Sequence, residues 1–223
     1  MKWFFSLFSK SDRLAPEPAK SSRVQPMNPS KILFSVPTLA GDIANLEPID
    51  RPPTRGDVVI SEDDWSQLEF YPQSALTTVQ GHLTELKTFA EANRKGSGWR
   101  KVYVRKIQRS LVITAADPIR HLEKLLSVKA GAPPFIIASS AIAGRIGNGF
   151  SFDLGGNTQL YGYLANNGIP VLAASVGAKA DNMKLATAFM RLHQSDKVML
   201  VDWRAQLLLV GVSPDGNIQT WRP

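Results

Sequence analysis

Residues 197–222 read KVMLVDWRAQLLLVGVSPDGNIQTWR, and this stretch decides the fold class. Two apolar runs rich in β-forming residues, 198–201 and 207–212, are separated by a short polar segment. Pro214, Asp215 and Gly216 then supply a fixed φ, a side chain that bonds the nearby backbone and a permissive residue, as a tight turn requires. The stretch therefore predicts a C-terminal antiparallel β-meander of three strands.

Upstream of the meander, the apolar periodicity predicts about three helices. Apolar residues recur at three- and four-residue spacing over residues 75–90, 119–126 and 183–192. Asp117 followed by Pro118 is typical of an N-cap and a first helical residue, and Gly131 is the expected C-cap of that helix.

The remaining periodic segments are short and strand-like. Glycine- and asparagine-rich turns near residues 156 and 167 separate three runs of β-forming residues, which predicts consecutive hairpins. Strands and helices do not alternate strictly, so we expect an α+β fold with a mostly antiparallel sheet of short strands. The expected strands outside the meander are 58–60, 100–106, 111–114, 134–139, 150–154, 159–164 and 169–174.

The composition allows a well-packed domain without covalent cross-links. The chain has 223 residues, of which 43% are hydrophobic. It contains no cysteine, which excludes disulfides, thiolate nucleophiles and Cys-ligated zinc. We expect neither a cofactor nor a metal, because His82, His121 and His193 lie in separate segments without ligand spacing.

The distribution of prolines predicts the domain organisation. Residues 11–55 contain eight of the fifteen prolines and one glycine, which is typical of an extended linker. We therefore expect a mobile, disordered arm over residues 1–56 and a single α+β domain over residues 57–223. Residues 32–46 are too apolar for full exposure, so this part is expected along the folded body or along a partner.

The first ten residues, MKWFFSLFSK, form an amphipathic pattern. On a helix Trp3, Phe4, Leu7 and Phe8 share one side, which favours attachment to a partner or to a membrane surface; a frayed terminus is the alternative. The apolar run is too short for a signal peptide or a membrane span. We expect a cytoplasmic protein, with peripheral contact to the inner membrane face as a variant of this hypothesis.

The net charge of +7 is concentrated in one region. Residues 91–129 hold ten Lys or Arg against three carboxylates, whereas residues 57–69 hold five carboxylates and no base. The charge is therefore regional, as at an interaction surface.

The segment WRKVYVRKIQR, residues 99–109, is the candidate binding site. As a strand it would alternate its side chains, with Val102 and Val104 pointing into the core and basic and aromatic residues on the outer face. Such a face suits an acidic protein partner or single-stranded nucleic acid; a solvated strand, or pairing with the chain's own acidic segment, is the alternative. The expected site residues are Trp99, Arg100, Lys101, Tyr103, Arg105 and Arg109.

The catalytic patterns are weak. AASVG, residues 173–177, follows an apolar run and precedes a helix, the setting of a nucleophile elbow, but alanine replaces the first glycine. Ser175 with His193 is therefore the weaker hypothesis of a serine hydrolase. GRIGNG, residues 144–149, matches neither the dinucleotide nor the P-loop pattern.

The preferred interpretation is a non-enzymatic protein-binding module that docks an acidic partner. A bacterial adaptor, a subunit of a complex or a toxin-neutralising protein would each use such a module. Single-stranded nucleic-acid binding is the first alternative and the serine hydrolase the second.

Overall fold

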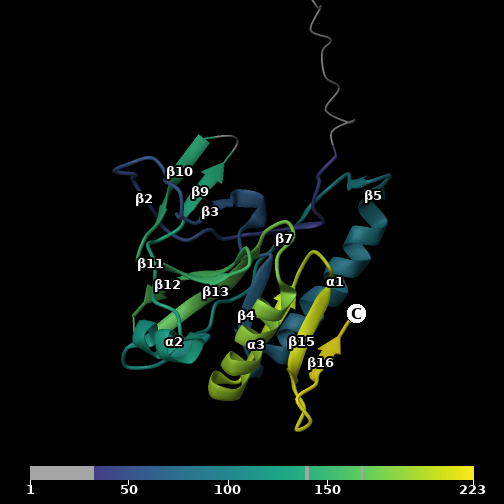
Figure 1. Cartoon of the computed structure of the whole chain (residues 1–223). Coiled ribbons are helices and arrows are strands. Elements are labelled where there is room, and N and C mark those ends of the chain that lie inside the picture. Colours follow the sequence, from purple (N-terminus) through teal and green to yellow (C-terminus); the bar gives the residue numbers. More distant parts are fainter. Residues whose placement is uncertain (1–32, 139–140, 167) are drawn as a thin grey trace, which may run out of the picture. The chain divides into compact units, whose positions relative to one another are not determined.

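The computed structural model describes residues 33–138, 141–166 and 168–223, and the compact unit that contains them is Leu33–Pro223. Three α-helices in these residues accompany a large, mostly antiparallel sheet (Figure 1). The α+β class is therefore confirmed.

The central sheet has eight strands and includes the expected meander. Its order is β11-β12-β13-β4-β14-β15-β16, with β8 also pairing with β13. Every pair in it is antiparallel. The bounds are β4 Leu68–Pro72, β8 Ile113–Thr114, β11 Gly149–Gly155, β12 Thr158–Ala165, β13 Gly168–Val176, β14 Val198–Asp202, β15 Leu207–Val212 and β16 Ile218–Trp221.

Helices α2 (Pro118–Leu126) and α3 (Asn182–Asp196) cover one face of this sheet. Their apolar stripes pack on every second residue of the strands, and Leu122, Phe189 and Leu192 are fully buried there. Asp117 caps α2 as expected, since its carboxylate accepts from the Arg120 N–H at 3.0 Å. The expected C-cap at Gly131 is wrong, because α2 ends at Leu126 and Ser127 takes the left-handed conformation.

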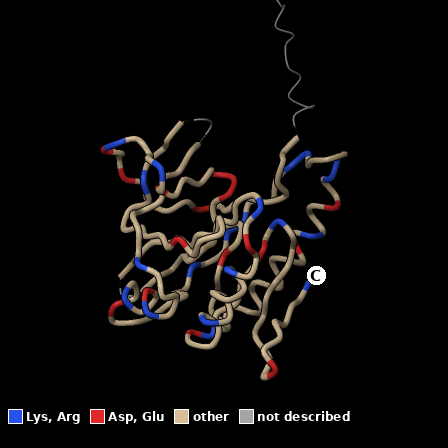
Figure 2. The backbone as a smooth tube through the Cα atoms, in the orientation of Figure 1, with Lys and Arg blue, Asp and Glu red and all other residues tan. Residues whose placement is uncertain are grey.

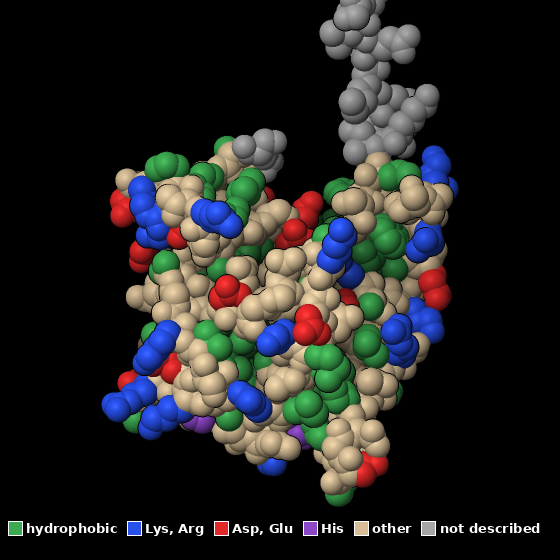
Figure 3. Space-filling model, viewed as in Figure 1, with side chains coloured by type: hydrophobic (Ala, Val, Ile, Leu, Met, Phe, Trp, Pro, Cys, Tyr) green, Lys and Arg blue, Asp and Glu red, His purple; other side chains and the backbone are tan. Residues whose placement is uncertain are grey.

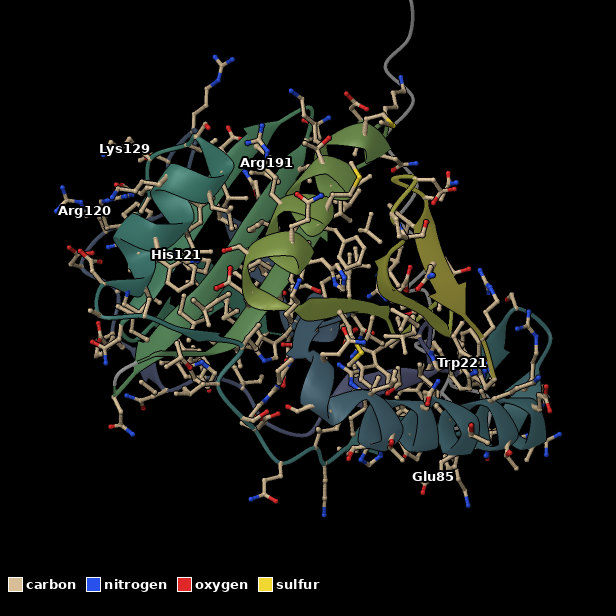
Figure 4. All side chains as sticks on the ribbon, turned by 90° about the horizontal axis from the view of Figure 1, so that it is seen from below. Glu85, Arg120, His121, Lys129, Arg191 and Trp221 are labelled. Carbon is tan, nitrogen blue, oxygen red and sulfur yellow. The ribbon has the colours of Figure 1, made fainter. Side chains whose placement is uncertain are left out.

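Helix α1 (Leu76–Asn93) covers the opposite face under the meander (Figure 4). It buries Val79, Leu83 and Leu86 against the side of β4, β14 and β15 that α3 does not contact. Trp203, which follows β14, is fully buried in this layer.

A second sheet covers the remainder of that face. Its order is β2-β10-β9-β3, and it packs on β12 and β13 through a cluster around Trp65 and Tyr161, whose ring centroids are 5.3 Å apart. The bounds are β2 Leu46–Glu47, β3 Val59–Ser61, β9 Phe135–Ala138 and β10 Ala141–Ile146.

Two short strand pairs complete the fold. β1 (Thr38–Ala40) pairs in parallel with β7 (Tyr103–Arg105), and β5 (Arg94–Lys95) forms a hairpin with β6 (Gly98–Trp99). β1 and β2 lie in the region expected to be an arm. Because Val36 and Thr38 are buried and Thr38 bonds β7, the compact unit begins at Leu33 rather than at Asp57. The apolar residues 32–46 were expected to lie along the folded body or along a partner. The structure of residues 33–46 supports packing along the folded body.

Candidate partner-binding surfaces

The side chains of β7 alternate in the opposite sense to the prediction. Val104 is 48% exposed, whereas Arg105 is 2% exposed. The alternation itself is present, but β1 and the segment before β4 cover the side of Arg105. The expectation that Val104 points into the core and Arg105 outwards is therefore wrong.

Arg105 occupies a polar pocket assembled from distant segments. Its Nη2 donates to the Ser66 carbonyl at 2.9 Å and its Nη1 to Thr38 Oγ1 at 3.1 Å. The guanidinium lies 4.9 Å from the centre of the Trp203 ring. Burial lowers the pKa of Arg105 to about 10. These contacts make Arg105 a structural residue.

Arg109 is also used within the fold. It binds both carboxylate oxygens of Asp42, each at 2.9 Å, and its Nη1 donates to buried Glu69. Glu69 accepts a second bond from the Tyr71 hydroxyl at 2.7 Å. Glu69 belongs to the acidic segment 57–69, so the alternative in which acidic and basic segments pair within the chain is supported at this position.

Tyr103 packs against α1 rather than presenting its ring to solvent. Its ring lies edge-on to Phe89 at 5.6 Å, and its hydroxyl donates to Glu85 at 2.7 Å. Burial, together with the Glu85 carboxylate, raises the pKa of Tyr103 to about 12.

The other three expected residues lie on or next to the β5–β6 hairpin. Trp99 is half-buried, whereas Arg100 and Lys101 are exposed. The hairpin turns at Gly96, whose φ of +60° suits glycine. It brings Arg94 and Lys95 beside them, with the Arg94 guanidinium 5.3 Å from the Trp99 ring centre. We call the exposed side chains of Arg94, Lys95, Arg100 and Lys101 the basic hairpin.

The basic hairpin has no internal counter-charge among the described residues. None of its four cations forms an ion pair there, whereas Arg51, Arg109, Arg145 and Arg204 each do. In Figure 2 basic positions gather near the β5 end of α1. The hairpin therefore presents uncompensated positive charge.

A second surface is an apolar hollow that the sequence analysis did not identify. It has a volume of about 800 Å³ and lies between the first half of α3 and the strand ends near the β14–β15 turn. Leu68, Leu185, Leu207, Leu209 and Ile218 line it and are half-buried. In Figure 3 hydrophobic side chains gather over β15, beside α3. We call this hollow the α3 groove.

The sequence signal for the α3 groove was ambiguous. Its leucines follow the periodicity of core residues, and only the oblique path of α3 leaves them partly uncovered. Asp181, at one end of α3, bonds Gly156 in the β11–β12 turn, while His193 near the other end lies over Gly211 of β15. Both contacts join segments that are distant in sequence.

Ser175 and His193 do not form a catalytic pair. Ser175 lines the α3 groove, whereas His193 lines a different hollow with Lys197 and Gly211. His193 Nδ1 lies 2.9 Å from the Val198 carbonyl, to which it donates. The geometry therefore does not support the hydrolase hypothesis.

Part of the acidic segment 57–69 and the histidine of α2 also form bonds within the fold. Residues 62–64 form a short 3₁₀ helix, where Asp64 pairs with Arg204 at 2.5 Å. His121 on α2 bonds Asp196 on α3 at 2.9 Å. Arg191 on α3 donates to the last carbonyls of α2. Figure 4 labels His121 and Arg191. Within the described ranges no cluster of three or more acidic or histidine side chains could hold a metal ion.

The expected attachment residues Trp3, Phe4, Leu7 and Phe8 lie outside the described residues. In the described part of the chain, the helices are too short or too polar to cross a membrane. Comparison with protein families, with curated proteins and with solved structures finds no match for this chain.

Proposed function

We propose that this chain is a non-enzymatic protein-binding module that docks an acidic surface of a partner protein through the basic hairpin. The observation that carries the proposal is the uncompensated charge of Arg94, Lys95, Arg100 and Lys101 within one short hairpin. Like charges held this close repel one another, and carboxylates on a partner would relieve that repulsion. Arg and Trp are also favoured anchors at protein interfaces.

Single-stranded nucleic acid fits this surface less well. Binding of that kind uses open aromatic rings on which successive bases stack. Here the Trp99 ring lies beside the Arg94 guanidinium, and the Tyr103 ring packs against Phe89. Arg105 and Arg109, which would have contacted phosphates, are bonded within the fold.

The test compares two charge-reversed variants of equal net charge. Arg100→Glu/Lys101→Glu alters the basic hairpin, and Lys124→Glu/Lys184→Glu alters exposed lysines of α2 and α3. Full-length protein and both variants are used for affinity capture, and bound proteins and nucleic acids are both identified. The captured partner is then titrated at increasing salt.

We expect one protein partner whose affinity falls about tenfold or more in the hairpin variant and stays unchanged in the control. Its binding should also weaken with salt, because exposed charges are screened. A partner retained equally by both variants contradicts the proposal. Nucleic acid lost only in the hairpin variant supports the alternative.

A further inference from the structure

The α3 groove exists because α3 crosses the strands obliquely. The contacts of Asp181 with Gly156 and of His193 with Gly211 fix the two ends of the helix. The corner of the sheet next to the β14–β15 turn is consequently left without a covering helix (Figure 1). Ala174 and Leu200 form its buried base.

The groove has the dimensions of a short helix. Its floor includes residues of the neighbouring strands β13, β4, β14 and β15. At a strand spacing of about 4.8 Å, these four strands extend about 15 Å, which is the length of a helix of about ten residues. The lining leucines are only half-buried, so the groove is an open trough and does not enclose a small molecule.

The polar end of the groove has one uncompensated negative charge. Asp64, Asp202 and Arg204 line it. Arg204 is paired with Asp64, whereas Asp202 accepts only the Ala205 N–H, at 2.8 Å, and forms no ion pair with a described residue. A cation on the occupant would complement Asp202.

We propose that the α3 groove binds an amphipathic helix of a partner protein, with apolar side chains at three- and four-residue spacing and a Lys or Arg that pairs with Asp202. This mode is helix-in-groove recognition. The inference goes beyond the proposed function, because it concerns the opposite face of the sheet and does not rest on the basic hairpin. It assigns to this chain a second partner surface of opposite charge.

The test selects ligands from a random library of twelve-residue peptides displayed on phage. Immobilised full-length protein is the target, and Ala186→Trp, which places an indole in the groove, is used for counter-selection. We expect an enriched family with helically spaced leucine-like residues and a basic residue. The proposal would be overturned if the enriched peptides are acidic or match this chain's own sequence. It would also be overturned if no peptide is enriched on the parent protein relative to Ala186→Trp.

The best peptide is then synthesised and its affinity is measured against four variants. Ala186→Trp should weaken binding at least about tenfold by blocking the groove. Asp202→Asn keeps the acceptor for the Ala205 N–H but removes the charge, and it should weaken binding about three- to fivefold. Ala92→Trp, exposed on α1, and Arg100→Glu/Lys101→Glu should leave the affinity unchanged.

Two controls keep the result interpretable. Circular dichroism and thermal unfolding establish that each variant is folded. Ala205→Trp, on the exposed β14–β15 turn, replaces Ala186→Trp if the latter does not fold. If neither tryptophan variant weakens binding of the peptide, the proposal that the peptide binds in the α3 groove is overturned. If Asp202→Asn does not weaken binding, the proposed ion pair with Asp202 is overturned. Loss of binding to the hairpin variant alone would assign the peptide to the basic hairpin.

Discussion

Arg105 and Lys101 belong to the same basic segment but have different environments. Arg105 is buried and bonded to Ser66 and Thr38, whereas Lys101 is exposed. Replacing Arg105 with alanine leaves these acceptors buried without a donor and removes the packing on Trp203. We predict that Arg105→Ala lowers the free energy of unfolding by about 3 kcal/mol and Lys101→Ala by less than about 0.5 kcal/mol.

Urea denaturation of the two variants measures this difference. The midpoint should fall clearly for Arg105→Ala, with an unchanged slope, and should stay close to that of the parent chain for Lys101→Ala. Equal midpoints would show that the bonds of Arg105 contribute nothing to stability.

At the scale of single residues, the sequence predicts alternation but not its direction. In a strand, adjacent side chains such as those of Val104 and Arg105 lie on opposite faces, and hydrophobicity then suggests that the valine is on the buried face. The structure reverses this because the partners of Arg105 come from residues 38, 66 and 203. A buried charge of this kind cannot be recognised from its own neighbours in the sequence.

At the scale of elements, two glycines with different surroundings provide a matched pair. A Cβ added to Gly162 on β12 would lie 2.1 Å from the Val171 carbonyl oxygen, whereas a Cβ on Gly81 in α1 has nothing within 4 Å. Gly162→Ala should therefore cost about 3 kcal/mol by forcing β12 away from β13. Gly81→Ala should gain up to about 1 kcal/mol, because alanine favours the helix.

Thermal unfolding of both alanine variants tests this pair. We expect a lower midpoint for Gly162→Ala and a higher one for Gly81→Ala. An unchanged midpoint for Gly162→Ala would mean that the two strands can separate without loss. Gly81→Ala serves as the control for a general effect of replacing glycine.

The elements that depend on local sequence were predicted well. The three helices, the cap at Asp117, the hairpins of β11 to β13 and the meander all follow from periodicity and turn residues. The parallel pairing of β1 with β7 and the placement of β4 between β13 and β14 were not predicted. These pairings join segments far apart in the chain. The contacts that set the path of α3, and so open the α3 groove, are also between segments distant in sequence.

At the scale of the whole molecule, the four tyrosines share one electrostatic property. Burial raises the pKa values of Tyr71, Tyr103, Tyr161 and Tyr163 above the ordinary value of about 10. Above about pH 10 the unfolded chain therefore releases protons that the folded chain retains. The contribution of these phenols to stability is complete below pH 10 and is lost as the pH rises through their folded-state values.

Ultraviolet titration of tyrosinate measures this difference directly. The chain in urea should be about half ionised near pH 10. The folded chain should be largely protonated at that pH, and its free energy of unfolding should decrease as the pH is raised further. Superimposable titration curves of the folded and unfolded chains would contradict the prediction. Tyr103→Phe, which retains three tyrosines, is the control that identifies the contribution of the Tyr103 hydroxyl to the titration curve.

The parallel pair of β1 and β7 has a consequence for folding kinetics. Burial of the Arg105 guanidinium requires contact with Thr38, which is 67 residues away in the sequence. Closing a loop of this length is slow compared with the local formation of α1 and the meander. Closure of β1 is then a late step in folding, and its reopening would break the bond between Arg105 and Thr38 together with the backbone bonds that join β1 to β7. The Gly41 and Tyr103 amides, which bond across this pair, are therefore expected to exchange with solvent only at the rate of global unfolding. Hydrogen exchange of these two amides at a faster, local rate would show that β1 opens on its own.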